Sequence, residues 1–349
     1  MAKPGEIRRI NIALQGGGAH GAFTWGVLDR LLEDPGIEIA AISGTSAGAL
    51  NGAALKAGLV EGDRDSAREN LDWLWTQMGA LEDMRLGGWM RALMPTPGAV
   101  SNMIEASLPF AAVDMAERLI SPYSYGPFYR NPLERVAERF HYDAVCADTG
   151  PAFFVSATNV RSGKIRVFSG AEINTDVLLA SACLPTVFQA VEITDPVTGG
   201  TDAYWDGGYT GNPALFPMFE PQFPDDIVIV NINPLERREV PVSPTDIQNR
   251  INEISFNSSL LRELRAIQFV KDLIADGRVS PGTMKDVQIH MIADDALMNE
   301  LSVATKMLPT PYILARLKEA GRAAATDFLD RHRDAIGVEC TVDLAAMFG

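Results

Sequence analysis

The sequence reads Gly44-Thr45-Ser46-Ala47-Gly48 between an apolar run at residues 37–43 and a segment rich in small residues at 47–56. The apolar run predicts a largely buried strand, and the segment after it predicts a helix. The pentapeptide has the pattern G-x-S-x-G, which is typical of a sharp strand-to-helix turn that exposes a serine side chain. Its two glycines relieve crowding and allow such a turn to close. We therefore expect Ser46 at a helix N-terminus, where the helix dipole favours a developing negative charge.

A second glycine-rich segment lies one β-α unit earlier and reads Gly16-Gly17-Gly18-Ala19-His20-Gly21. It follows a strand pattern at residues 8–14 and precedes a helical pattern at 22–33. The order strand, helix, strand, helix with short connections is typical of an α/β fold with a parallel sheet covered by helices. Later segments extend this order, with strands predicted at 152–158, 164–168, 226–232 and 286–292 and helices at 66–78, 174–183, 245–275 and 311–333.

The chain contains no internal repeat, low-complexity tract or linker, so we expect its 349 residues to form one domain. Residues 8–215 would form the core, and residues 216–349 would continue the same domain. The pattern is irregular at 81–130, which we interpret as an inserted helical cap. Its Met- and Trp-rich part, residues 81–94, could line an acyl-binding groove or touch a lipid surface, and a buried helix pair fits the composition equally well.

The first glycine segment can be interpreted in three ways. Gly16, Gly18 and Gly21 match the dinucleotide-binding pattern G-x-G-x-x-G, but the second strand lacks the acidic residue that such a site places at its end. No G-K-[ST] follows, which excludes a P-loop. A tight turn without a ligand is the second interpretation. The third is an oxyanion hole built from the backbone N–H groups of residues 16–19, and the serine turn nearby favours it.

A serine nucleophile needs a base, and histidine is the usual one. His290 lies inside the apolar run 287–292, and His332 lies in the arginine-rich end of the last predicted helix. Neither has the loop setting that a catalytic base favours, so we interpret both as structural residues. A carboxylate is therefore the better candidate for the base.

Asp206 is the leading candidate for this carboxylate. It follows a short apolar segment and precedes Gly207 and Gly208, which allow close approach of other backbone segments. The alternative interpretation of this site is an ordinary Asp-Gly turn. Asp195 and Asp202 are weaker candidates, because their sequence surroundings lack the two glycines.

Composition excludes several other classes of function. The net charge of −15 argues against nucleic-acid binding and against electrostatic adhesion to anionic membranes, so any lipid contact would come from apolar surface. The three cysteines form no C-x-x-C pair, and the four histidines form no H-E-x-x-H pattern, so we expect no metal and no other cofactor. The chain lacks a signal-peptide pattern and a run of about 18 apolar residues, so we expect a soluble, cytoplasmic protein with peripheral lipid contact left open.

These motifs together resemble those of the patatin-like phospholipase family. That family carries a G-G-G-x-[RK]-G loop, a G-x-S-x-G turn and a D-G-[GA] motif. This chain has them in the same order, at Gly16–Gly21, Gly44–Gly48 and Asp206–Gly208. Two further stretches fit, residues 180–188 and Asn212-Pro213. The resemblance spans roughly residues 8–215, and the C-terminal third matches no motif.

The resemblance implies a three-layer α/β/α fold and a lipid acyl hydrolase without a cofactor. Ser46 would be the nucleophile and Asp206 the general base, with the oxyanion bound by N–H groups of Gly17, Gly18 and Ala19 in the segment that Gly16 begins. His20 replaces the basic residue of the family's loop, so a fixed positive charge there is in doubt, and a packing role is equally open. An acyltransferase and a non-catalytic lipid-binding protein are the alternative functions.

Overall fold

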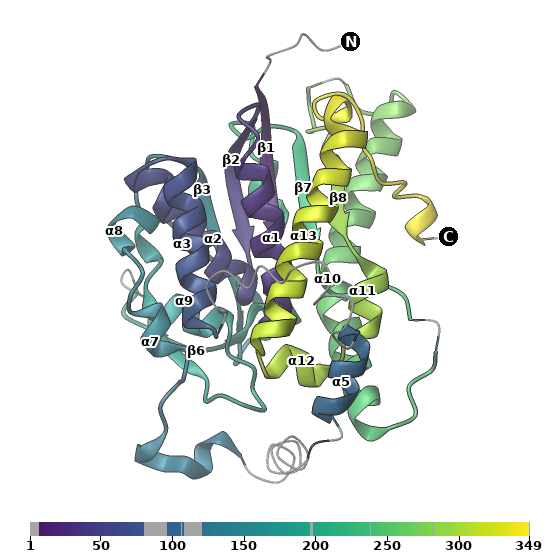
Figure 1. Cartoon of the computed structure of the whole chain (residues 1–349). Helices are drawn as coiled ribbons and strands as arrows, with labels where there is room; N and C mark the ends of the chain where they lie inside the picture. The colour runs from purple at the N-terminus through teal and green to yellow at the C-terminus, as the bar shows by residue number, and fades with distance from the viewer. Residues whose placement is uncertain are drawn as a thin grey trace.

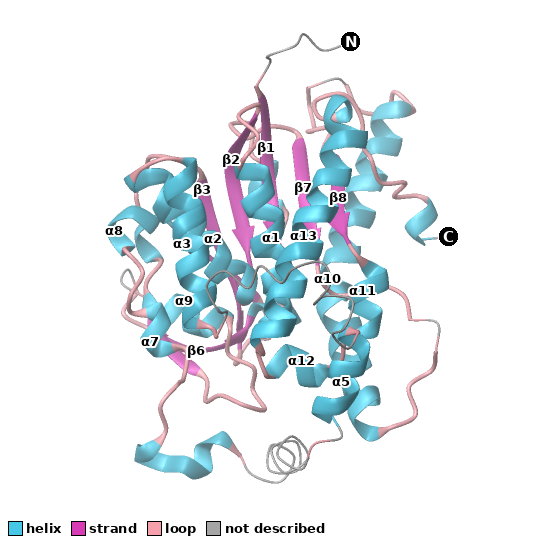
Figure 2. Ribbon diagram, viewed as in Figure 1, coloured by secondary structure: helices cyan, strands magenta, loops and turns pink. Residues whose placement is uncertain are grey.

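A mixed eight-stranded sheet forms the middle of the molecule in the computed structural model, which describes residues 7–79, 96–105, 107, 121–195, 198–237, 239–280 and 282–348 (Figures 1 and 2). The strand order is β5-β6-β3-β2-β1-β7-β8, and β4 pairs with β3 outside this order. The strands are β1 (Arg8–Leu14), β2 (Ile37–Gly44), β3 (Ala152–Asn159), β4 (Ile165–Ser169), β5 (Val191–Thr194), β6 (Thr201–Asp206), β7 (Asp226–Asn231) and β8 (Gln288–Ala293). Neighbours among β3, β2, β1, β7 and β8 are parallel, whereas β4, β5 and β6 pair antiparallel. The predicted, mostly parallel sheet is confirmed, and the β5–β6 hairpin was not predicted.

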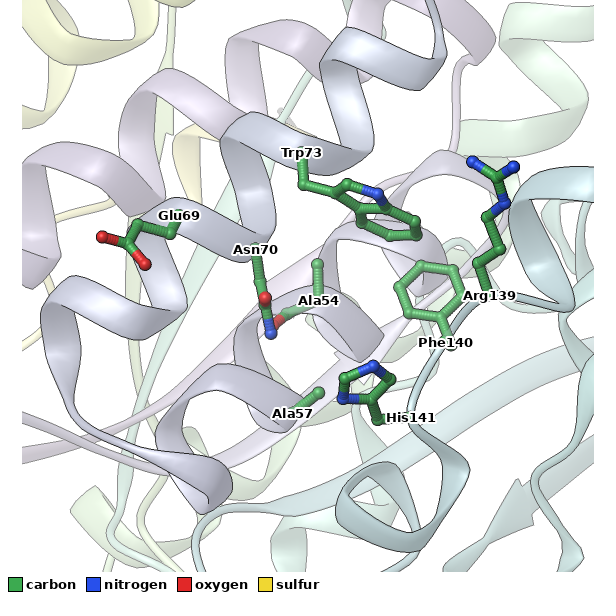
Figure 3. Close-up of a pocket in the computed structure, with 8 residues that line it drawn as sticks. All are labelled: Ala54, Ala57, Glu69, Asn70, Trp73, Arg139, Phe140 and His141. Carbon is green, nitrogen blue, oxygen red and sulfur yellow. The ribbon is translucent and has the colours of Figure 1, made fainter.

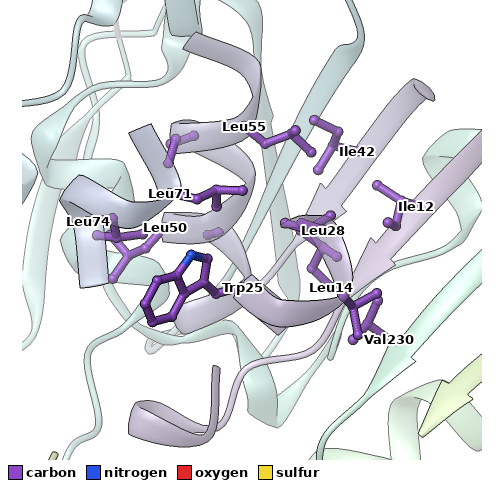
Figure 4. Close-up of a cluster of buried hydrophobic side chains, with 14 of the residues drawn as sticks. Ile12, Leu14, Trp25, Leu28, Ile42, Leu50, Leu55, Leu71, Leu74 and Val230 are labelled. Carbon is purple, nitrogen blue, oxygen red and sulfur yellow. The ribbon is translucent and has the colours of Figure 1, made fainter. Parts of the chain in front are cut away.

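Alternate side chains of the strands enter two hydrophobic cores, one on each face of the sheet. Val228 and Val230 of β7 join the core formed with α1, α2, α3 and α13, part of which is drawn in Figure 4. Ile227 and Ile229 join the core on the opposite face, where α10 supplies Leu264 and its neighbours. Two covered faces make the molecule a three-layer α/β/α structure, as expected.

The helices connect and cover the strands. The 3-10 turns used below are η1 (Gly18–His20), η4 (Gly207–Tyr209) and η5 (Phe216–Phe219). The α-helices are α1 (Gly21–Leu32), α2 (Ala47–Glu61), α3 (Arg64–Gln77), α5 (Pro97–Glu105), α7 (Glu134–Ala137), α8 (Tyr142–Val145), α9 (Thr175–Ser181), α10 (Pro244–Ala275), α11 (Asp295–Glu300), α12 (Val303–Met307) and α13 (Pro311–His332). Residues 81–94, for which a lipid-contacting role was considered, lie outside the described residues.

The apolar side chains of α10 are divided between the core and the surface. Leu264 and Ile267 are buried against the sheet, but Ile247, Ile251 and Ile254 are 43%, 53% and 55% exposed. The C-terminal half of the helix packs on the sheet, whereas the N-terminal half faces η4 and α12. The three exposed isoleucines therefore lie outside the hydrophobic core.

Candidate active site

The carboxyl edge of the sheet brings the two glycine segments together. Leu14, at the end of β1, lies in register with Gly44, at the end of β2, and with Val230 near the end of β7. The chain leaves all three strands at this edge, which is where open α/β sheets place their binding sites.

Ser46 occupies a strained turn between β2 and α2. It is the N-cap residue of α2, with φ 54° and ψ −123°, and it is the only non-glycine residue of the described chain with a positive φ. Such strain persists only where the surroundings hold it, and it is frequent at functional sites. A Cβ atom at Gly48 would lie 2.1 Å from the Leu14 carbonyl oxygen, and one at Gly44 would lie 2.7 Å from the Gly48 carbonyl oxygen. The turn therefore requires both glycines.

Two hydrogen bonds of Ser181, the last residue of α9, hold the Ser46 backbone. The Ser46 N–H donates to Ser181 Oγ at 2.9 Å, and that hydroxyl donates to the Ser156 carbonyl oxygen of β3 at 2.7 Å. Ser181 is fully buried, so water does not compete for these bonds. Its position in the stretch 180–188 was noted in the sequence, but this role was not predicted.

The first glycine segment packs directly on the serine. A Cβ atom at Gly16 would lie 2.7 Å from Ser46 Cβ, so only glycine allows this approach. The Gly16 N–H donates to Asn212 Oδ1 at 2.7 Å and is therefore not free to bind an oxyanion, contrary to the expectation for that residue. Within the described part of the chain, the N–H groups of Gly17 and Gly18 have no acceptor. Ala19 lies next to them in η1 and is buried.

Asp206 ends β6 and lies 1% exposed beside the serine. Its Oδ1 accepts a hydrogen bond from the Gly208 N–H at 2.7 Å. Burial raises the pKa of Asp206 to about 7, and the Gly208 N–H and the neighbouring Ser46 side chain oppose the rise. A Cβ atom at Gly207 would lie 2.2 Å from the Ser156 carbonyl oxygen, so this position also requires glycine. A carboxylate with a pKa near neutral is a suitable general base.

Strand β3 sets the positions of the serine and the aspartate relative to each other. Gly44 of β2 is paired with Val155 of β3, and Asp206 of β6 is paired with Ala157 of the same strand. The two carboxylates considered as alternatives lie elsewhere. Asp202 forms an exposed ion pair with Arg161 at 3.1 Å, and Asp195 accepts a hydrogen bond from the Thr198 N–H in the β5–β6 turn.

The two histidines near the end of the sequence, His290 and His332, make contacts that are typical of structural residues. His290 is fully buried in β8, where Nε2 lies 2.9 Å from an oxygen of Asp226, the first residue of β7 and thus at the far end of the sheet from Ser46. His332 ends α13 and packs on Phe328, with 5.8 Å between the ring centroids.

His20 is buried and neutral. Its Nε2 lies 2.9 Å from Thr305 Oγ1, and the Thr305 hydroxyl already donates to the Ser302 carbonyl oxygen at 2.8 Å. The imidazole must therefore donate through Nε2, and its buried Nδ1 has no hydrogen-bond partner among the described residues. Burial lowers the pKa of His20 well below 6.5, and the nearby charge of Lys306 adds to this effect. The packing interpretation of His20 thus agrees with its surroundings.

A network of buried amides, which was not predicted from the sequence, fixes the glycine segment. Gln15 Oε1 accepts hydrogen bonds from the N–H groups of Ile232 and Asn233, and Gln15 Nε2 donates to Asn257 Oδ1 at 3.3 Å. Asn233 Nδ2 donates to the Gly16 carbonyl oxygen at 2.7 Å. The only signal in the sequence is a set of polar residues that directly follow apolar strands.

A cavity of about 470 Å³ lies away from this site, between α2, α3 and residues 139–141 (Figure 3). Trp73 and Phe140 form part of its wall, and Ala54 lies on α2 at the floor. Ala54 is eight residues along α2 from Ser46, which at the rise of a helix is roughly 12 Å. None of the residues that line this cavity belongs to the serine site.

Two other features are missing from the described residues. They contain no cluster of three or more His, Cys, Asp and Glu side chains arranged to hold a metal ion. No helix among them is both long and apolar enough to cross a membrane.

Comparisons with known proteins agree with the motifs. The family model for patatin-like phospholipase matches residues 12–218. No curated protein matches the sequence. Among solved structures, VipD from Legionella pneumophila is similar at 15% identity and a TM-score of 0.42, over 95% of this chain and 72% of that one. ExoU, in its complex with SpcU from the type III secretion system of Pseudomonas aeruginosa, is similar at 16% identity and a TM-score of 0.29, over 95% of this chain and 61% of that one. Through the sequence match, which covers more than half of its length, the chain belongs to the patatin-like phospholipase family.

Proposed function

We propose that this protein hydrolyses carboxylic esters of lipids with a Ser46–Asp206 dyad. Family membership supports a lipid acyl hydrolase in general. The observation that carries the finer proposal is the buried Asp206 carboxylate, whose pKa the neighbouring Ser46 side chain lowers, beside the N–H groups of Gly17 and Gly18, which have no acceptor among the described residues. This arrangement combines a nucleophile, a base and donors for an oxyanion, which are the three requirements of acyl transfer through serine.

The reaction would proceed in two halves. Ser46 Oγ attacks the ester carbonyl carbon while Asp206 accepts the hydroxyl proton, and the Gly17 and Gly18 N–H groups bind the oxyanion. Collapse of the tetrahedral intermediate breaks the ester bond, and the leaving alcohol takes the proton from Asp206. Water then attacks the acyl-serine, transfers a proton to Asp206, and releases the fatty acid as that proton returns to Ser46.

We also propose that the protein meets its substrate at a lipid surface through the N-terminal half of α10. Ile247, Ile251 and Ile254 recur at helical spacing and are exposed, and Val240 and Val242 just before the helix are more than 80% exposed. The helix continues from this apolar surface to the site, because Phe256 packs on Tyr209 beside the Asp206 turn, with 5.1 Å between the ring centroids. Exposed apolar patches of this kind mark interaction surfaces.

The experiment that tests the catalytic proposal measures both labelling and turnover. The wild-type protein should react covalently with a fluorophosphonate probe and hydrolyse members of a panel of phospholipids, lysophospholipids, glycerides and p-nitrophenyl esters. Ser46→Ala should lose both, whereas Ser258→Ala, which removes a hydroxyl bonded within α10, should keep both. Labelling without release of fatty acid into water, but with transfer to an added alcohol, would favour the acyltransferase. Neither labelling nor turnover would favour the lipid-binding protein.

A further inference from the structure

A cluster of charged residues lies beside the glycine segment, outside the dyad. The Glu253 carboxylate of α10 is completely buried and accepts two hydrogen bonds from Arg237, at 2.7 and 2.8 Å. Arg250 and Lys306 each lie 3.3 Å from the same carboxylate. Three cations therefore surround one anion, in a chain whose net charge is −15.

The two arginines of this cluster have structural partners. Arg250 donates to the carbonyl oxygens of Pro234 and Leu235, and the third nitrogen of Arg237 donates to the Asn299 carbonyl oxygen. These bonds hold the loop that follows β7. Burial alone would raise the pKa of Glu253, but the Arg237 hydrogen bond and the charges of Lys306 and Arg237 lower it to about 2, so the carboxylate is ionised.

Lys306 differs from the arginines because it contacts the glycine segment. A Cβ atom at Gly18 would lie 2.5 Å from the Lys306 carbonyl oxygen, so the two backbones touch. The Lys306 ammonium lies 3.5 Å from Asn233 Oδ1, and the amide nitrogen of the same Asn233 donates to the Gly16 carbonyl oxygen. Its bonds to Glu253 and Asn233 are both long, and the side chain is 16% exposed. The backbone of Lys306 thus contacts the segment, and its ammonium reaches the segment through Asn233.

His20 of the segment does not supply this charge, because burial and the charge of Lys306 lower its pKa well below 6.5. We propose that Lys306 is a positioning residue of the active site, whose positive charge, directed by Glu253 and Asn233, stabilises the oxyanion of the substrate that the N–H groups of Gly17 and Gly18 bind. This inference rests on the proposed ester hydrolysis. A fixed charge near a water-poor site acts most strongly on the transition state, where the oxyanion develops, and less on the neutral substrate.

The test compares three variants of the full-length protein with a soluble p-nitrophenyl ester. Lys306→Met and Lys306→Gln remove the charge, and the glutamine keeps a hydrogen-bond donor for Glu253. Both should lower kcat roughly tenfold with KM changed less than about twofold. Lys306→Arg keeps the charge and should restore most of kcat. Lys271→Met, which removes a lysine paired with Asp286 at the other end of α10, is the control and should leave kcat unchanged.

A pH profile separates charge from structure. Burial lowers the pKa of Lys306 while the charge of Glu253 opposes this, and the other ionisable groups that face it are His20, Arg237 and Arg250. The kcat of the wild-type protein should fall at alkaline pH as Lys306 loses its proton. The Lys306→Arg variant should stay active there, since a guanidinium keeps its proton.

Two outcomes would overturn the role of Lys306: a glutamine variant with the same kcat as the wild-type protein, or an arginine variant that is no more active than the glutamine variant. A wild-type protein without turnover and without Ser46 labelling would instead overturn the proposed function itself, and this inference with it.

Discussion

The backbone N–H of Ser46 donates a hydrogen bond to the hydroxyl of Ser181 across 135 residues of sequence, at 2.9 Å. The residue two positions later, Cys183, accepts a hydrogen bond from the Asp206 N–H through its carbonyl oxygen at 2.8 Å. The end of α9 thus holds the backbone of both members of the proposed dyad. The Ser181 side chain takes no part in the proposed chemistry, so its removal tests positioning alone.

We expect Ser181→Ala to leave the Ser46 N–H and the Ser156 carbonyl oxygen without partners in a buried site. A buried polar group that loses its partner costs about 1–3 kcal/mol of stability. The strained turn would also relax, and kcat should fall by roughly 10- to 100-fold with KM little changed. Urea unfolding and steady-state kinetics measure the two effects. Wild-type kcat in a folded Ser181→Ala protein would show that the turn holds its geometry without this bond.

The pKa of Asp206, raised to about 7 by burial, predicts the pH dependence of turnover. The general base must be ionised, so kcat/KM should rise with pH through a single ionisation near pH 7 and then level off at mildly alkaline pH. Initial rates between pH 5 and 8.5 with a neutral ester provide the measurement. A midpoint near 4, the ordinary value for an aspartate, would contradict the desolvated environment assigned to this residue.

The same burial predicts that the proposed base destabilises the fold. The pKa of Asp206 is 3.8 in its ordinary state and about 7 in the folded protein, so the folded form retains a proton that the unfolded form has lost between these values. Stability from this group is therefore full below about pH 4 and is lost as pH rises through 7. Asp206→Asn stays neutral, and at pH 8.5 it should be more stable by an amount on the order of 4 kcal/mol.

Thermal unfolding of Asp206→Asn and wild type at pH 8.5 and pH 4 provides the measurement, with hydrolysis assayed in parallel. The variant should be inactive, and its gain in stability should disappear at the lower pH. Equal melting temperatures at both pH values would show that the carboxylate is better solvated than its surroundings indicate.

The exposed face of α10 predicts binding to lipid. Ile251→Asp places a charge in the middle of the apolar surface formed by Ile247, Ile251, Ile254, Val240 and Val242. We expect this variant to lose co-sedimentation with zwitterionic phosphatidylcholine vesicles and activity on vesicle substrates, while its kcat on a soluble ester stays within about twofold. Gln248→Asp, on the same helix but at a polar position, is the matched control. Equal vesicle binding by wild type and Ile251→Asp would reject this surface as the docking site.

Local patterns in the sequence predicted the parts of the structure that depend on neighbouring residues. The strand before Gly44 and the helix after Ser46 follow from the apolar pattern, and the glycines of both segments occur where added side chains would collide with backbone. The order of the motifs predicted the family and the layers of the fold. The catalytic roles of Ser46 and Asp206 stay predictions.

The remaining features depend on contacts between distant parts of the chain, which periodicity does not describe. His20 meets Thr305 across 285 residues, and Gln15 meets Asn257 across 242. The apolar pattern of α10 is continuous in sequence, but only its C-terminal half reaches the sheet, so the burial of Ile251 could not be judged from helical spacing. For the same reason the sequence did not identify Lys306 as a neighbour of Gly18.

Strands β2 and β6 pair with positions of β3 that are two residues apart, and this has a consequence for where the chain can accept insertions. Gly44 and Asp206 are placed by Val155 and Ala157, so their separation depends on the register of one strand and not on the length of the connections between them. The β5–β6 turn at Gly199 is exposed, and nothing lies within 4 Å of an added Cβ there. A foreign domain inserted at this turn should therefore leave the distance between Ser46 and Asp206 intact, whereas a residue added to β3 between Val155 and Ala157 should change it.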